Sequence, residues 1–251
     1  NAALGYSALG ANTTGDYNVA VGMYSLDANT TADNNTAVGY NALTANTTGA
    51  YNVAVGANAL DANTTASNNV GIGQSALGAN TTGANNVAMG YGSGQRNTTA
   101  GNNTFIGHLT GEYNTTGAGN TALGAYSLDA NTTASNNTAV GVHSLGANTT
   151  GTDNTAVGES SGAAVTTGIN NTLIGAESGD AITDADHNTA VGFRSLSTNV
   201  LGSRSIAIGA GALFAQNPAS AADMYNVGIG YEAGVAVTTG VRNTLIGGLA
   251  G

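Results

Sequence analysis

The sequence predicts an all-β protein: a parallel β-solenoid made of coils of 17 residues. The same 17-residue pattern recurs along the chain of 251 residues. Each copy contains one short β-branched segment followed by an invariant glycine, and one cluster of Asn, Thr and Gly. A copy this short has no room for two helices and a turn, but it suits one coil with two turns.

The copies form a single predicted array over residues 1–251. Thirteen copies span 17 residues, the copy at 205–225 spans 21, and the last is cut short at Gly251. They start at residues 1, 18, 35, 52, 69, 86, 103, 120, 137, 154, 171, 188, 205, 226 and 243. Positions within a copy are numbered from 1. Because the pattern is under way at Asn1 and still running at Gly251, we expect a fragment of a longer fibre protein.

Positions 2 to 4 are predicted to form a strand. Position 2 is Thr, Val or Ile in every copy but the first, and position 4 is always aliphatic or Met, a pattern typical of strands. Position 5 is Gly from Gly5 to Gly247, which predicts a positive φ or a backbone approach too close for a Cβ. Position 1 is Asn in every copy except at Ser205, and stacking in register predicts a column of amides.

The rest of each copy is expected to hold a second short strand at positions 6 to 10 and then a turn, because Asn, Thr and Gly cluster after it. Position 9 is Leu or Gly. In the copies from Asn154, Asn171 and Asn226 it is Gly, and position 12 changes from Asn to Val or Ile. We interpret this exchange as conservation of core volume. Asp61 and its equivalents at position 10 are interpreted as caps of backbone amides.

Both faces of the predicted strand are apolar, because position 3 is Ala or Gly except at Phe105, Leu173 and Leu245. A thin coil covers only one face of its strand, and monomeric proteins rarely expose a long apolar stripe. We therefore expect sister chains to cover the alanine-lined face, with a homotrimer about a common axis as the preferred arrangement.

The repeat resembles two families of fibrous proteins. The motif Asn-x-Ala-Val/Ile-Gly followed by x-x-Ser/Ala-Leu resembles the head repeats of YadA-like trimeric autotransporter adhesins, and the 17-residue form with Asn-Thr-Thr-Gly is similar to bacteriophage tail-fibre repeats. The resemblance implies a left-handed parallel β-roll, a homotrimer, and a location outside the cell or on a virion surface. The expected function is a shaft or head segment used in host or surface attachment. An adhesin head that binds glycans or matrix directly and an ice-binding solenoid are the alternatives.

The composition argues against several partners. The chain has 14 acidic and 4 basic side chains, a net charge of −10, and no lysine or cysteine. Nucleic-acid binding needs cations that displace phosphate counterions, so no nucleic-acid partner is expected. No apolar run approaches 18 residues, so no membrane insertion is expected in this segment.

We expect neither an enzyme nor a cofactor or metal site. His108, His143 and His187 occupy unrelated positions of their copies, whereas a catalytic base or metal centre needs partners at defined spacing. Three aspartates lie in the stretch 180–186. Calcium binds six to eight oxygens, so we interpret this stretch as a solvated turn.

Bulky side chains at the variable position 7 and at the start of the insertion are the candidate contacts with a cell-surface glycan or receptor, with simple surface decoration as the alternative. They are Tyr24, Tyr126, His143, Arg194 and Phe214. Insertions in solenoids often lie on binding faces.

Overall fold

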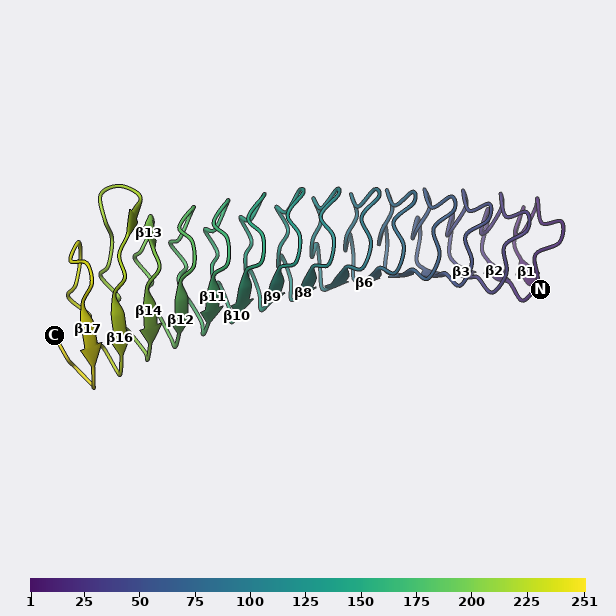
Figure 1. Ribbon diagram of the computed structural model, residues 1–251. Helices are drawn as coiled ribbons and strands as arrows, with labels where there is room; N and C mark the ends of the chain where they lie inside the picture. Colours follow the sequence, from purple (N-terminus) through teal and green to yellow (C-terminus); the bar gives the residue numbers. More distant parts are fainter. The chain divides into compact units, whose positions relative to one another are not determined.

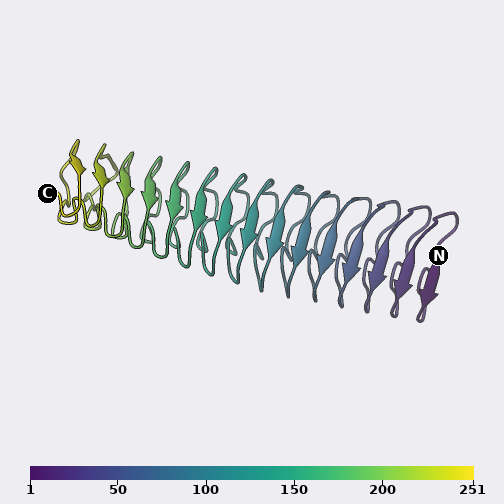
Figure 2. The same cartoon turned by 90° about the horizontal axis from the view of Figure 1, so that it is seen from below.

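The computed structural model describes residues 1–251 in two compact units, Asn1–Asn120 and Thr121–Gly251. Both units are parallel β-solenoids, in which each copy of the repeat forms one coil with one strand (Figures 1 and 2). The all-β solenoid prediction is therefore confirmed. The model contains no helix of the length and apolar character that crossing a bilayer requires.

In the first unit, strands β1 to β7 lie side by side in chain order. Their bounds are β1 Ala2–Leu4, β2 Val19–Val21, β3 Thr36–Val38, β4 Val53–Val55, β5 Val70–Ile72, β6 Val87–Met89 and β7 Thr104–Ile106. Each residue pairs with the equivalent residue of the next copy, as Ala3 does with Ala20. The parallel register therefore follows the repeat period.

The second unit holds a main sheet and a small second sheet. The main sheet contains β8 Thr121–Leu123, β9 Thr138–Val140, β10 Thr155–Val157, β11 Thr172–Ile174, β12 Thr189–Val191, β14 Ile206–Ile208, β16 Val227–Ile229 and β17 Thr244–Ile246. The small sheet pairs β13 Gly202–Ser203 with β15 Ala222–Asp223. Ile206 pairs with Val227 across the long copy, so the four extra residues loop out and the main sheet keeps its register.

The second strand expected at positions 6 to 10 is absent, so that prediction is wrong. These residues form successive turns, in which the amide of Ser25 donates to Gly22 O and that of Asn29 to Leu26 O. Positions 7 and 9 have positive φ, as at Tyr24 (60°) and Leu26 (50°), and a strand needs negative φ throughout. The frequent Asn, Ser and Gly at position 7 were the sequence signal for this conformation.

Hydrogen bonds join successive coils around the whole circumference, not only at the strands. The Leu26 amide donates to Ala42 O at 3.0 Å, and the Thr30 amide donates to Thr47 O at 3.2 Å. The turns thus satisfy their backbone groups from coil to coil, as a sheet does.

The glycine at position 5 is required on both of the predicted grounds. In the fourteen copies that start at residues 1–226 or at 243 and reach position 5, its φ lies between 125° and 144°, a region that side chains rarely adopt. A Cβ at Gly141 would lie 2.3 Å from the carbonyl oxygen of Gly158 in the next coil. The column of glycines therefore lets the coils stack closely at the end of the strand.

The core of each coil is narrow and is lined by positions 3, 8 and 9. Ala20 at position 3 and Leu26 at position 9 are both fully buried. The alanine-lined face therefore points into the coil and is not available to sister chains, contrary to our expectation. Positions 2 and 4 of the strand point outward instead, because side chains alternate along a strand.

Core volume is exchanged between position 9 and position 3 of the following copy. A Cβ at Gly162 would lie 2.8 Å from Leu173 Cδ1, and a Cβ at Gly94 would lie 2.8 Å from Phe105 Cδ2. A large side chain at position 3 thus fills the space that a missing leucine leaves. Val165 and Ile182 at position 12 are also fully buried, so the predicted volume exchange is confirmed and extends to a third position.

This exchange predicts the outcome of a swap between Leu60 and Gly71. Leu60→Gly leaves a cavity and is expected to cost about 2–4 kcal/mol, reduced by about 1 kcal/mol because leucine no longer adopts a left-handed conformation. Gly71→Leu alone collides with Leu60, whose Cγ would lie 3.1 Å from the new Cβ. Together the two changes reproduce the Gly162–Leu173 arrangement, and we expect the double variant to recover most of the lost stability in urea unfolding. Additive losses would contradict the exchange.

Two columns of buried asparagines run along the coils. At position 1, the Asn18 amide donates to Asn1 Oδ1 at 2.8 Å, and Asn18 Nδ2 donates to Ala32 O at 2.8 Å. At position 12, Asn29 Nδ2 donates to Asn12 Oδ1 at 2.8 Å and to the same Ala32 O at 3.1 Å. The first column was predicted and is confirmed; the second was not. Both tie the Asn-Thr-Thr turn to the start of the next strand.

The second column is interrupted where an apolar residue replaces asparagine. Val165 occupies position 12 in the copy after Asn148, so no amide reaches Asn148 Oδ1, and this buried atom has no hydrogen-bond partner. An unsatisfied buried acceptor costs about 1–3 kcal/mol. The apolar core gained at Val165 and Leu173 offsets part of this cost.

The long copy repairs both columns with a different pair of residues. Ser205 replaces asparagine at position 1, and Gln216 replaces it at position 12. Gln216 Oε1 accepts hydrogen bonds from Ser205 Oγ at 3.1 Å and from Asn226 Nδ2 at 2.8 Å. The longer amide therefore spans the gap that the serine leaves.

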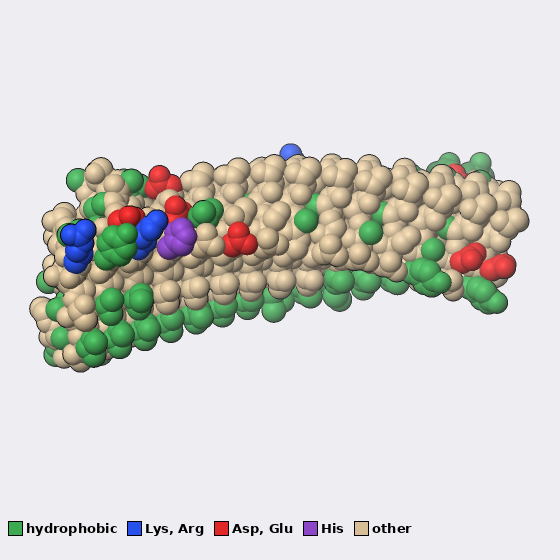
Figure 3. Space-filling model, in the orientation of Figure 1, with side chains coloured by type: hydrophobic (Ala, Val, Ile, Leu, Met, Phe, Trp, Pro, Cys, Tyr) green, Lys and Arg blue, Asp and Glu red, His purple; other side chains and the backbone are tan.

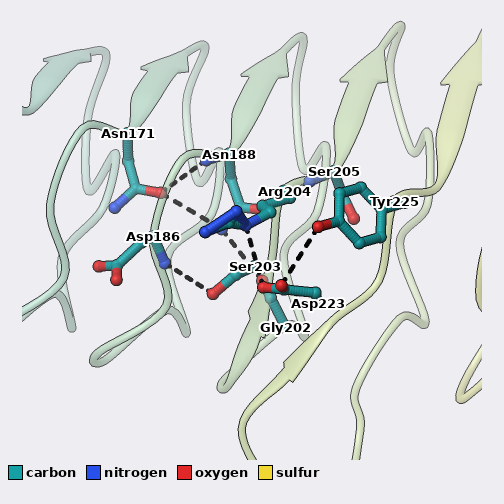
Figure 4. A network of polar contacts seen from close by, with 9 residues as sticks. All are labelled: Asn171, Asp186, Asn188, Gly202, Ser203, Arg204, Ser205, Asp223 and Tyr225. Atoms are coloured by element: carbon teal, nitrogen blue, oxygen red, sulfur yellow. Dashed lines mark hydrogen bonds and ion pairs between the residues drawn. The ribbon is translucent and has the colours of Figure 1, made fainter.

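Polar contacts also fix the residues on either side of the insertion (Figure 4). Arg204 Nε donates to Asp223 Oδ1 at 3.1 Å, and the Tyr225 hydroxyl donates to Asp223 Oδ2 at 3.3 Å. The Asp186 amide donates to Ser203 Oγ at 2.9 Å, and Ser205 N donates to Asn188 Oδ1 at 3.0 Å. The extra residues therefore leave from, and return to, an ordered part of the coil.

Candidate binding surfaces

The outward face of the strands is a row of uncharged side chains, hereafter the strand face, formed by positions 2 and 4. Position 4 contributes Val, Ile, Leu or Met throughout. Met89 is 40% exposed in the first unit, and Leu123 is 46% exposed in the second. Figure 3 shows hydrophobic side chains in a row along the edge where the strands lie. An apolar surface of this kind indicates an interaction site.

Three of the five candidate contact residues pack against aromatic neighbours. The Tyr24 ring makes edge contacts with Tyr6 and Tyr40, at centroid distances of 5.6 and 6.4 Å. The Tyr126 and His143 rings stack at 5.1 Å with 6° between their planes. These side chains form small aromatic clusters on the coil surface.

The other two candidates, Arg194 and Phe214, line one cavity of about 360 Å³ in the second unit. Sequence reasoning named them separately and missed the residues that complete the cavity. Phe193, Tyr231, Glu232 and Gly211 share its wall with them. The missed signal is the alternation at position 7, where the small Gly211 lies between the long Arg194 and Glu232 of the neighbouring copies.

Neighbouring groups hold the charged side chains of this cavity in place. Arg194 Nε donates to Glu177 Oε2 of the preceding coil, and this hydrogen bond raises the pKa of Arg194. The Arg194 guanidinium also lies 5.3 Å from the centroid of the Phe193 ring, a cation–π contact. The hydrogen bond with Glu232 raises the pKa of Tyr231, so its phenol keeps its proton at neutral pH.

The aspartates of the stretch 180–186 do not converge. Asp186 Oδ1 accepts a hydrogen bond from the Ile169 amide at 2.8 Å, and Asp180 Oδ1 accepts one from Ser197 Oγ at 2.6 Å. The model contains no group of three His, Asp or Glu side chains placed to hold a metal ion. These carboxylates join neighbouring coils.

Asp61 supports the capping interpretation of position 10. Its carboxylate accepts backbone hydrogen bonds from its own amide and from Ala62, and these bonds lower its pKa. Partial burial raises the pKa by more than they lower it, so the net shift is upward. The side chain lies beside Gly78 at position 10 of the next coil, 3.3 Å from where a Cβ would be.

Comparisons of the chain with family models, with curated proteins and with solved structures gave no match.

Proposed function

We propose that this chain is a structural segment of an extracellular or virion fibre, of the kind found in phage tail fibres, and that it assembles as a homotrimer through the strand face. In this proposal the chain supports attachment to a host or surface. It also includes the left-handed winding that the resemblance to trimeric adhesin heads and tail fibres implies.

One observation carries the proposal: no copy has a charged residue at position 2 or position 4, although the chain has a net charge of −10. The carboxylates lie elsewhere on the coils. Equivalent residues of a homotrimer approach one another around the axis, so a charged strand face would bring like charges together. An uncharged aliphatic face allows this approach and hides its apolar surface from water.

The repeat also matches a mechanical role. Each coil bonds to its neighbours through backbone amides and asparagine columns, so stability accumulates along the array. The conserved features of the copies serve stacking, and no chemical group recurs in a catalytic arrangement. A direct-binding adhesin head remains the alternative within the same fibre class, and an ice-binding solenoid remains a more distant one.

The mass of the native assembly tests the proposal. We expect sedimentation velocity of the 251-residue chain to give three times the chain mass of 24.3 kDa, with circular dichroism free of helix. A single-chain mass at micromolar concentration would overturn self-association. A dimer would keep the strand face as an interface but overturn the trimer.

A further inference from the structure

We infer that the cavity at Gly211 binds one neutral pyranose ring of a glycan. We call it the Gly211 notch, and its walls are Phe193, Arg194, Phe214, Tyr231 and Glu232. The inference goes beyond the proposed shaft function and does not depend on it, because the notch is formed within one chain.

The notch exists because a side chain is missing from a regular row. Position 7 carries Glu177, Arg194 and Glu232 in the neighbouring copies, and Gly211 lies between the last two. A Cβ at Gly211 would lie 3.1 Å from Glu232 Cγ. A side chain at this position would therefore occupy the space that the cavity now leaves open.

Aromatic rings flank the opening on the position-6 side. Phe193 and Tyr231 are 53% and 59% exposed, although each carries a large apolar surface. Phe214 adds a third ring from position 10. One face of a pyranose ring presents C–H groups, which pack favourably on the electron-rich face of an aromatic ring.

The charged groups match the hydroxyls of a sugar. Arginine offers only hydrogen-bond donors and a carboxylate only acceptors, whereas a hydroxyl both donates and accepts. Arg194 and Glu232 stand on opposite sides of Gly211 in the row. Neighbouring hydroxyls of one ring are therefore able to bond with both groups, and a few placed polar groups among apolar walls are typical of ligand sites.

The same pair disfavours ligands with a net charge. A carboxylated sugar that pairs with Arg194 also meets Glu232, and Glu177 already occupies Arg194 Nε. A quaternary ammonium ion would suit the aromatic walls, but it meets the Arg194 guanidinium. A neutral ring avoids both repulsions, and the cavity of about 360 Å³ is of a size for one such ring.

Saturation-transfer NMR on the whole chain tests the inference, with methyl α-D-glucopyranoside, methyl α-D-mannopyranoside and methyl β-D-galactopyranoside as probes. We expect at least one of them to bind with a dissociation constant of about 1 mM, as small ligands do. Gly211→Asn fills the notch and is expected to weaken binding at least tenfold. Asparagine fits this position, because Asn41 and Asn58 adopt φ of 55° at position 7.

The matched control is Ser75→Asn, which makes the same residue at position 7 of a copy in the first unit and is expected to leave binding unchanged. Tyr231→Ala removes an exposed wall of the notch and provides a second variant if Gly211→Asn lowers the melting temperature. The inference is overturned if no neutral probe binds, if binding survives both notch variants, or if glucuronate or choline binds more tightly than every neutral probe. Sedimentation of the same samples reports the assembly separately, so failure here leaves the fibre proposal standing.

Discussion

Glutamate at both Val140 and Val157 is expected to leave the protein as single chains. The two residues pair in neighbouring strands of the second unit and lie on the strand face. In a homotrimer the new carboxylates of three chains would meet around one axis, out of water, where each ionised group is costly unless it is paired. Sedimentation velocity at pH 7 should show the mass of the assembly falling to that of one chain.

The control places the same charges on another face of the same coils. Thr133 and Thr150 at position 14 are exposed, so Thr133→Glu with Thr150→Glu is expected to leave the assembly intact. Both double variants should keep the circular dichroism spectrum of the parent. A Val140→Glu, Val157→Glu protein that assembled like the parent would rule out the strand face as the interface.

Alanine at Gly141 is expected to cause the largest loss of stability of any single methyl addition to the chain. Gly141 has φ of 133°, and the added Cβ would lie 2.3 Å from the Gly158 carbonyl oxygen. Strain and collision act together, and the backbone oxygen has no room to move without breaking the ladder of the next coil. We expect a cost of about 3 kcal/mol or more, measured by urea unfolding.

Gly146→Ala is the matched control, because Gly146 belongs to the same copy and its φ is not positive. The nearest atoms to its added Cβ would be His143 O at 3.3 Å and Asp129 Oδ1 at 3.4 Å, which small shifts accommodate. We expect a change within about 1 kcal/mol. Equal losses at the two glycines would show that position 5 has no special requirement.

The sequence was sufficient to predict those features that depend on repetition. Stacking in register turns a recurrent Asn1-type residue into a column and an invariant Gly5-type residue into a close contact, so the period alone predicts both. The volume exchange at Val165 and Ile182 was also predictable, because one apolar side chain disappears where another is gained.

The features that the sequence did not predict depend on backbone direction inside a copy. Leucine rarely adopts a positive φ, so Leu26 and its equivalents indicated a strand where the chain turns. The inward direction of Ala20 was missed because period-2 alternation does not say which face is covered when both are apolar. The Gly211 notch was missed because it depends on three successive copies, whereas residues were judged one copy at a time.

The asparagine columns have a consequence for how such a chain can change in length. Each coil receives the side chain of the coil before it and offers an identical one to the coil after it, as Asn18 does between Asn1 and Asn35. Gain or loss of one whole copy therefore presents the same mating surfaces at the new junction, whereas a partial copy misaligns every amide beyond it. Reach is thus adjustable in steps of 17 codons, without a new solution for packing at each step.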